Sequence, residues 1–299
     1  EIKGSDLLLK VIESKNQGED AKPVKSGDTV LMNVVGRQAD SPDHLDGPIF
    51  QEGKSWLVTL GEPHCLVRAL VVGLENLLAG QTAYIYATNK YNHLGETGIR
   101  KYKPSPTSEE YSLSGTSNVM YMVTVIQIVV DTSQLNPYFP IQKALTMKNI
   151  ANDVYQYEWE AGGTARERSI HLYEKVGKSM KILKEGTYFN SVEEDHPQRK
   201  QCRTIMLDSL NNVIAVYMRA KRWQKAREAA SAVLREDSKN AKALLRNAKS
   251  YMMDPEMSLE EKDAALQKAE KIIVYKDKED AELQKLRANW KKKQAATKG

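Results

Sequence analysis

Cysteine and histidine are scarce in this sequence of 299 residues. Its two cysteines, Cys65 and Cys202, are too few for a disulfide framework and are typical of a reducing compartment. The histidines lie far apart and, even with the cysteines, give no spacing typical of a zinc site. They are His44, His64, His93, His171 and His196. A phosphate-binding glycine loop and a nucleophile elbow are also missing from the sequence. We therefore expect no metal and no cofactor.

Long apolar runs are absent as well. No stretch approaches the roughly 18 apolar residues that a membrane helix needs, and no signal-peptide pattern opens the chain. We therefore expect a cytoplasmic protein and no membrane contact by this segment. Residues 1–130 have a net charge of −3 and the remainder a net charge of +8. A basic second half favours acidic partners. Because no basic run is interleaved with aromatic residues, nucleic acid is not expected among them.

Residues 1–130 have the texture of an α+β domain. Segments rich in β-branched and aromatic residues, bounded by Gly, Pro, Asp and Ser, predict strands. The clearest are TVLMNVVGRQ, SWLVTLG, TAYIYATNKY and NVMYMVTVIQIVV. Between the second and third, CLVRALVVGLENL has apolar residues at helical spacing and predicts a short helix. The expected architecture is an antiparallel sheet wrapped on that helix.

The second half of the sequence is helical and repetitive. Residues 131–140 carry two prolines that discourage a continuous helix, so they are predicted to be a linker. In residues 141–278, Asn212 and Arg246 are 34 positions apart, as are Tyr217 and Tyr251. This is the period of tetratricopeptide (TPR) repeats, each a pair of helices. We expect an all-α superhelix of three repeats.

Five polar side chains predict a carboxylate clamp in this superhelix. Lys148 and Asn152 are four residues apart, as are Lys242 and Arg246, so each pair shares a helix face. With Asn212 they occupy positions that line one concave surface when repeats stack. Amide, ammonium and guanidinium groups there would donate to a peptide's terminal carboxylate and to an acidic side chain near it. The alternative is ordinary solvated surface charge.

These residues carry a resemblance to known families. The second half resembles the TPR domains of Hsp90 co-chaperones, whose clamp uses Lys and Asn, then Asn, then Lys and Arg in successive repeats. The first half, with SGDTV, VVGR, DGPIF, VTLG and AGQTA in this order, resembles an FKBP-type peptidyl-prolyl isomerase domain. Together they are similar to a large immunophilin. The resemblance implies binding of the acidic Hsp90 C-terminal peptide of the MEEVD type, with Hsp70 as a second partner.

The FKBP resemblance extends to the proline-binding pocket only in part. Phe50, Trp56 and Tyr121 match aromatic pocket positions, although plain core packing would also explain them. The family's Tyr, Asp and floor Trp are replaced by Val34, Gln51 and Leu70. The resemblance therefore implies a weak or inactive isomerase that acts as an interaction module. An active isomerase in which His93 or Tyr91 substitutes is the alternative, and a TPR adaptor for another acidic tail is a third hypothesis.

Two further expectations concern the ends of these domains. With Leu70 in the floor position, the first domain is most similar to the divergent, membrane-anchored FKBP branch. This implies a parent protein tail-anchored to mitochondria or the endoplasmic reticulum through a segment absent here. In residues 279–299, Leu283, Leu286 and Trp290 share one helix face, with Lys and Arg on the other. This pattern predicts a helix that caps the last repeat, and calmodulin recognition is the alternative.

Overall fold

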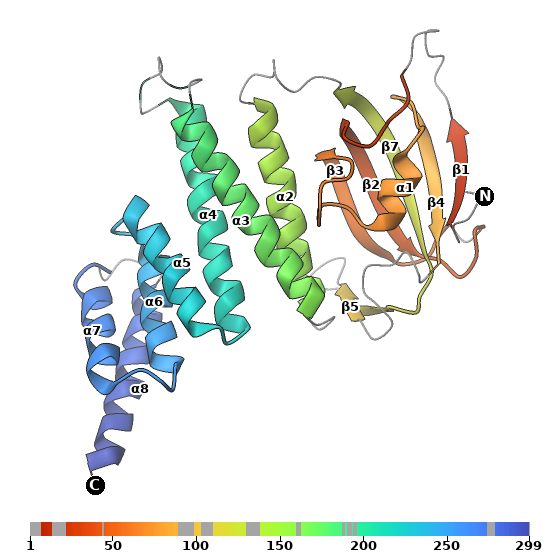
Figure 1. The fold of residues 1–299 in the computed structure, drawn as a ribbon. Helices are drawn as coiled ribbons and strands as arrows, with labels where there is room; N and C mark the ends of the chain where they lie inside the picture. The colour runs from red at the N-terminus through yellow and green to blue at the C-terminus, as the bar shows by residue number, and fades with distance from the viewer. Residues whose placement is uncertain are drawn as a thin grey trace. The chain divides into compact units, whose positions relative to one another are not determined.

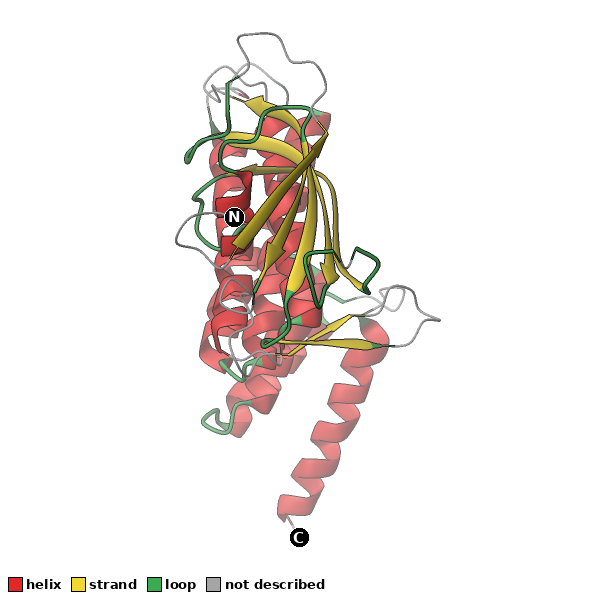
Figure 2. Ribbon diagram, turned by 90° about the vertical axis from the view of Figure 1, so that its right-hand side faces the viewer, coloured by secondary structure: helices red, strands yellow, loops and turns green. Residues whose placement is uncertain are grey.

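The computed structural model describes most of the chain. The described residues are 7–13, 22–43, 45–88, 99–102, 110–129, 138–159, 163–186, 189, 193, 196–273 and 279–298. They belong to two compact units, Glu1–Cys202 and Arg203–Gly299, and each is described by itself. All described strands precede residue 138, and every described helix except the first begins at or after that position. Figure 2 colours the helices red and the strands yellow.

The first unit contains a five-stranded antiparallel sheet, as the sequence predicts (Figure 1). Its strand order is β1-β4-β7-β2-β3. The strands are β1 (Leu7–Glu13), β2 (Thr29–Gln38), β3 (Ile49–Thr59), β4 (Thr82–Ala87) and β7 (Val119–Val129). Alternate residues of β2 are buried, which is the period expected of a strand with one face on a core. A separate pair is formed by β5 (Ile99–Tyr102) and β6 (Tyr111–Ser114).

The predicted short helix packs against this sheet. Helix α1 (Arg68–Leu74) buries Leu70 and Leu74 and contacts β4. Its Gly73 lies so close to the sheet that a Cβ atom there would come within 2.4 Å of the Ile85 side chain. The absence of a side chain at this position is therefore what lets the helix approach β4.

Two long helices also belong to the first unit. Helix α2 (Tyr138–Tyr157) packs against α3 (Gly163–Glu185), and α2 also contacts the edge strand β3. The Leu57 N–H of β3 donates to the Thr146 hydroxyl of α2 at 3.1 Å. An exposed sheet edge invites pairing with other chains, so a helix over it protects the sheet.

The boundaries therefore differ from those expected from the sequence. Helix α2 begins at Tyr138, inside the predicted linker 131–140, and Pro140 lies in its first turn, where a missing N–H does no harm. The predicted TPR domain of three repeats, residues 141–278, spans parts of both compact units, because the first helical pair belongs to the unit that contains the sheet. The contacts of α2 with β3 join this pair to the sheet, and a pattern of local periodicity does not reveal them.

The second unit is helical throughout its described residues. Helix α4 (Pro197–Arg219) begins before it, and α5 (Trp223–Glu236), α6 (Ala241–Met253), α7 (Leu259–Glu270) and α8 (Asp280–Lys298) lie within it. Helices α5 and α7 each pack against α6. None of the helices in the described ranges combines the length and apolar character needed to cross a membrane.

Helix α8 closes one end of this unit's core. Leu283 and Trp290 are 1% and 4% exposed and pack in a cluster contributed mainly by α6 and α7. Its other buried members are Leu244, Leu245, Ala248, Leu266, Ala269 and Ile273. Arg287 of α8 also forms ion pairs with Asp263 and Glu270 of α7. The predicted apolar face of the last helix is thus turned into the core.

Candidate functional site

A pocket in the second unit contains two of the five predicted clamp residues. Its volume is about 320 Å³. It is lined by Ala215 and Met218 of α4, by Lys242, Leu245, Arg246 and Lys249 of α6, and by Glu279 and Glu282 around the start of α8. Because the three cations stand at helical spacings of four and three residues, they share the face of α6 that borders the pocket. The pocket is therefore built to attract an anion on its α6 side.

Contacts with Asn211 and Asn240 hold this cationic face in place. The Arg246 guanidinium donates to the main-chain oxygen of Asn211 on α4 at 2.5 Å. The buried Asn211 amide donates to the side chain of Asn240 at 3.2 Å, and Asn240 caps the N-terminus of α6 by accepting from the Ala243 N–H. Predicted clamp residue Asn212, half-buried, is the next residue of α4. The sequence interpretation missed Asn211 and Asn240; an Asn just before a helix is the signal that identifies the cap.

The two cations predicted for the clamp differ in exposure. Lys242 is exposed, whereas Arg246 is half-buried and already bonded to the neighbouring helix. On the other wall, Glu282 pairs with Lys249. An acidic ligand would be attracted by α6 and repelled by Glu279 and Glu282, so its negative charges would be directed toward Lys242 and Arg246.

The other two predicted clamp residues lie in the first unit. Lys148 and Asn152 are half-buried on α2, one helical turn apart. The Tyr173 hydroxyl of α3 donates to the side-chain oxygen of Asn152 at 2.5 Å. Tyr173 is only 1% exposed, so this bond holds the amide of Asn152 with its oxygen toward α3. Tyr173 was not singled out from the sequence, and nothing in the local pattern distinguishes it from a core residue.

The three aromatic residues of the FKBP resemblance are all buried. Phe50 and Tyr121 are 3% and 1% exposed, and their rings meet edge to face with centroids 5.8 Å apart. They close over Gly36, where a Cβ atom would lie 2.8 Å from the Phe50 ring. The Trp56 ring lies on Gly53 in the same way, with 2.3 Å to such an atom. Burial raises the pKa of the Tyr121 hydroxyl, which stays protonated at neutral pH.

Arg100 of the same chain packs against the Phe50 ring. Its guanidinium carbon lies 5.6 Å from the centroid of the Phe50 ring, and its Nη2 donates to the Phe50 main-chain oxygen at 2.9 Å. Arg100 is completely buried. The ring of Phe50 therefore supports an internal cation. The proposed substitutes His93 and Tyr91 lie outside the described residues.

Replaced pocket positions and thiols are also part of the core. Val34 and Leu70 are each 1% exposed, and Gln51 is 6% exposed. Burial, with a smaller contribution from Glu62, raises the pKa of Cys65 to about 12, and a thiol in that state is unreactive. Burial likewise raises the pKa of the Cys202 thiol to about 11.

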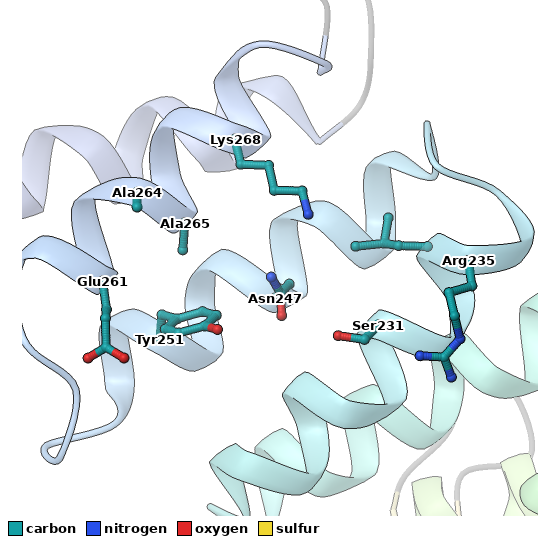
Figure 3. A pocket seen from close by; sticks show the side chains of 9 residues that line it. Ser231, Arg235, Asn247, Tyr251, Glu261, Ala264, Ala265 and Lys268 are labelled. Atoms are coloured by element: carbon teal, nitrogen blue, oxygen red, sulfur yellow. The ribbon is translucent and has the colours of Figure 1, made fainter.

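A larger pocket of about 520 Å³ contains none of the predicted site residues (Figure 3). It lies between α5, α6 and α7, where Ser231, Asn247 and Lys268 project toward a common space. Its lining combines Arg235 and Lys268 with Glu261, so it has no single charge that would select a class of ligand.

Comparison with known proteins finds no matching family model. Among solved structures, a multi-domain immunophilin from Arabidopsis thaliana aligns over 88% of this chain and 93% of its own, with 16% identity and a TM-score of 0.36. The C-terminal TPR-containing domain of a Plasmodium falciparum FK506-binding protein aligns over 55% of this chain and 97% of its own, with 20% identity and a TM-score of 0.39. The first neighbour is thus described as an immunophilin and the second as a TPR-containing domain, but scores this low carry no argument about function. Neither match supports the membrane-anchored branch expected from the sequence.

Proposed function

We propose that the protein is a cytoplasmic co-chaperone of the immunophilin type, with an FKBP-like sheet domain and a TPR superhelix. Its basic groove binds the acidic C-terminal peptide of Hsp90, of the MEEVD type, and Hsp70 is a second partner with the same chemistry. The assignment of Lys148 and Asn152 to the same peptide as Asn212, Lys242 and Arg246 is what the resemblance to the TPR domains of Hsp90 co-chaperones implies.

The observation that carries the proposal is the pocket beside α6. Lys242, Arg246 and Lys249 border it from one helix face, while Ala215 and Met218 give it an apolar wall. A C-terminal carboxylate preceded by an acidic and an apolar side chain matches that combination of charge and surface. Cations without such an apolar wall would favour any polyanion, whereas this lining favours the end of a peptide.

The same proposal assigns little isomerase activity to the sheet domain. An isomerase lowers a rotation barrier of about 18–20 kcal/mol by enclosing the proline in a dry pocket that favours the twisted amide. Here Phe50, Trp56 and Tyr121 are at most 7% exposed, and Arg100 lies against the first of them. A proline ring would have to displace that buried cation to reach the aromatic wall.

Calorimetry with the full chain and a pentapeptide ending in MEEVD tests the peptide-binding function. We expect micromolar or tighter binding that is lost when the peptide's C-terminus is amidated, because amidation removes one charge from the ligand alone. Equal affinity for the two peptides would rule out a carboxylate clamp. Tight binding of an unrelated acidic tail, with no preference for MEEVD, would instead favour the chaperone-independent adaptor.

An isomerase assay on the same protein tests the second part of the proposal. Acceleration of cis–trans exchange in an X-Pro peptide is expected to be far below that of an ordinary FKBP domain. Full activity would contradict the interaction-module role and restore the active isomerase with substituted pocket residues. The two assays are independent, so either half of the proposal can fail alone.

A further inference from the structure

Arg100 is a buried cation with an unusually complete set of partners. From β5 it donates through Nη2 to the Phe50 carbonyl at 2.9 Å and to Asp153 of α2 at 2.6 Å, and it pairs through Nη1 with Glu158. Its side chain is 0% exposed, and Tyr157 lies on it at 5.8 Å. A buried charge is tolerated only when it is paired and hydrogen-bonded, and the planar guanidinium satisfies several acceptors at once.

A second arginine extends the network to the next helix. Arg168 of α3 pairs with Glu158 at 3.4 Å, and Glu158 is only 1% exposed. The same guanidinium donates to the carbonyls of His64 and Cys65, at 2.8 and 3.3 Å, in the segment between β3 and α1. One carboxylate is therefore shared by cations from the sheet domain and from the helical pair.

The contacts with the sheet enclose the clamp residues of α2. Thr146, two positions before Lys148, accepts from β3, and Asp153, next to Asn152, accepts from Arg100. Nearer the start of the helix, Lys143 donates to the Thr59 hydroxyl at 2.8 Å. A helix held at these points cannot rotate or slide without breaking a buried ion pair.

We propose that Arg100 is a positioning residue for the two predicted clamp residues of α2, Lys148 and Asn152, and that the sheet domain takes part in peptide binding by holding this helix. This inference rests on the proposed function, which supplies the peptide that Lys148 and Asn152 of α2 would bind. The Phe50 ring then packs against the Arg100 guanidinium, and Arg100 in turn holds α2 through Asp153 and Glu158. Removing the guanidinium should loosen α2 and weaken the peptide complex, although Lys148 and Asn152 themselves are unchanged.

The test compares Arg100→Met with Lys54→Met in the full chain. Lys54 is an exposed cation on β3, so the control makes the same charge change elsewhere in the first unit. Peptide affinity is measured by calorimetry at a temperature where circular dichroism shows both variants fully folded. Hydrogen exchange is followed in parallel over α2 and over α6. We expect Arg100→Met to lower affinity by about fivefold or more and to speed exchange in α2, with α6 and the control unchanged.

The outcomes separate the two claims. If the wild-type protein binds the peptide and Arg100→Met binds it equally well, the positioning role is wrong and the proposed function stands. If the wild-type protein does not bind, the proposed function is wrong, and unchanged exchange in α2 would dismiss the positioning role as well. Arg100→Lys covers the case in which the Met variant does not fold, because lysine keeps the charge but lacks the planar guanidinium that bonds several acceptors at once. Wild-type affinity and wild-type exchange in Arg100→Lys would overturn the inference.

Discussion

Arg246 and Lys242 belong to one proposed ligand site, but their surroundings predict different consequences of truncation. Arg246 is half-buried and donates to the main-chain oxygen of Asn211 on α4, whereas Lys242 is exposed. Arg246→Ala therefore removes a contact to the peptide and a link between α4 and α6. Lys242→Ala removes only the contact to the peptide.

The structure sets the size of each effect. A hydrogen bond to a charged group contributes about 1.5–3 kcal/mol, so either substitution should weaken peptide binding by roughly tenfold to a hundredfold. Losing the Arg246 donor should also cost about 1–3 kcal/mol of unfolding free energy. For a unit of this size, each 1 kcal/mol corresponds to a fall of roughly 4–8 °C in Tm. Lys242→Ala should leave Tm unchanged.

Calorimetry and thermal unfolding of three variants test this difference. The control is Lys285→Ala, which removes an exposed lysine of α8 that does not line the pocket. It should change neither affinity nor Tm. The reasoning is refuted if Arg246→Ala binds as tightly as the wild type, or if Lys242→Ala lowers Tm as much as Arg246→Ala does.

Three further predictions test the packing on which both sites depend. Gly53→Ala should lower the stability of the first unit by about 1–3 kcal/mol, measured by urea unfolding, because the new methyl group would overlap the Trp56 ring. Burial acts to raise the pKa of Glu62, but ion pairs with Lys143 of α2 and Lys175 of α3 outweigh it and hold the pKa below its ordinary value of 4.5. Glu62 is thus protonated at a higher pH in the unfolded chain than in the folded chain. The wild type should therefore be more stable than Glu62→Gln at pH 7, and this difference in unfolding free energy should shrink as the pH falls through the folded-state pKa. Trp290→Ala should destabilise the second unit by about 3–5 kcal/mol in thermal unfolding, and calcium-dependent calmodulin binding without loss of stability would favour the alternative role of α8.

The strands and helices that local pattern predicts are those with one clear buried face. Strand β2 occupies all of TVLMNVVGRQ, which its β-branched residues predict to be a strand, and alternate residues of it are buried. Leu283 and Trp290 likewise lie in the core because their helical spacing places both on one face. In contrast, β1, β5 and β6 were not predicted. Strands β5 and β6 have only four residues each, too few for a period to be recognised.

The candidate sites were predictable to the extent that their chemistry recurs at repeat spacing. Lys242 and Arg246 could be identified because a helix brings residues four apart onto one face. Arg100 could not be identified, since its partners Asp153 and Glu158 are more than fifty positions away in sequence. Long-range pairing of this kind leaves no local periodic signal.

The aromatic wall around Phe50 illustrates why similar residues need not keep a family's activity. A pocket that has lost its polar groups and its floor must still be filled, because an empty apolar cavity is destabilising. Here a buried arginine lies against one ring and bonds two carboxylates at the end of α2. The Phe50 ring that would contact a proline in an isomerase thus packs against an internal cation. Retention of Phe50 and Tyr121 is therefore evidence for a structural socket as much as for catalysis, and only a variant that removes Arg100 distinguishes the two.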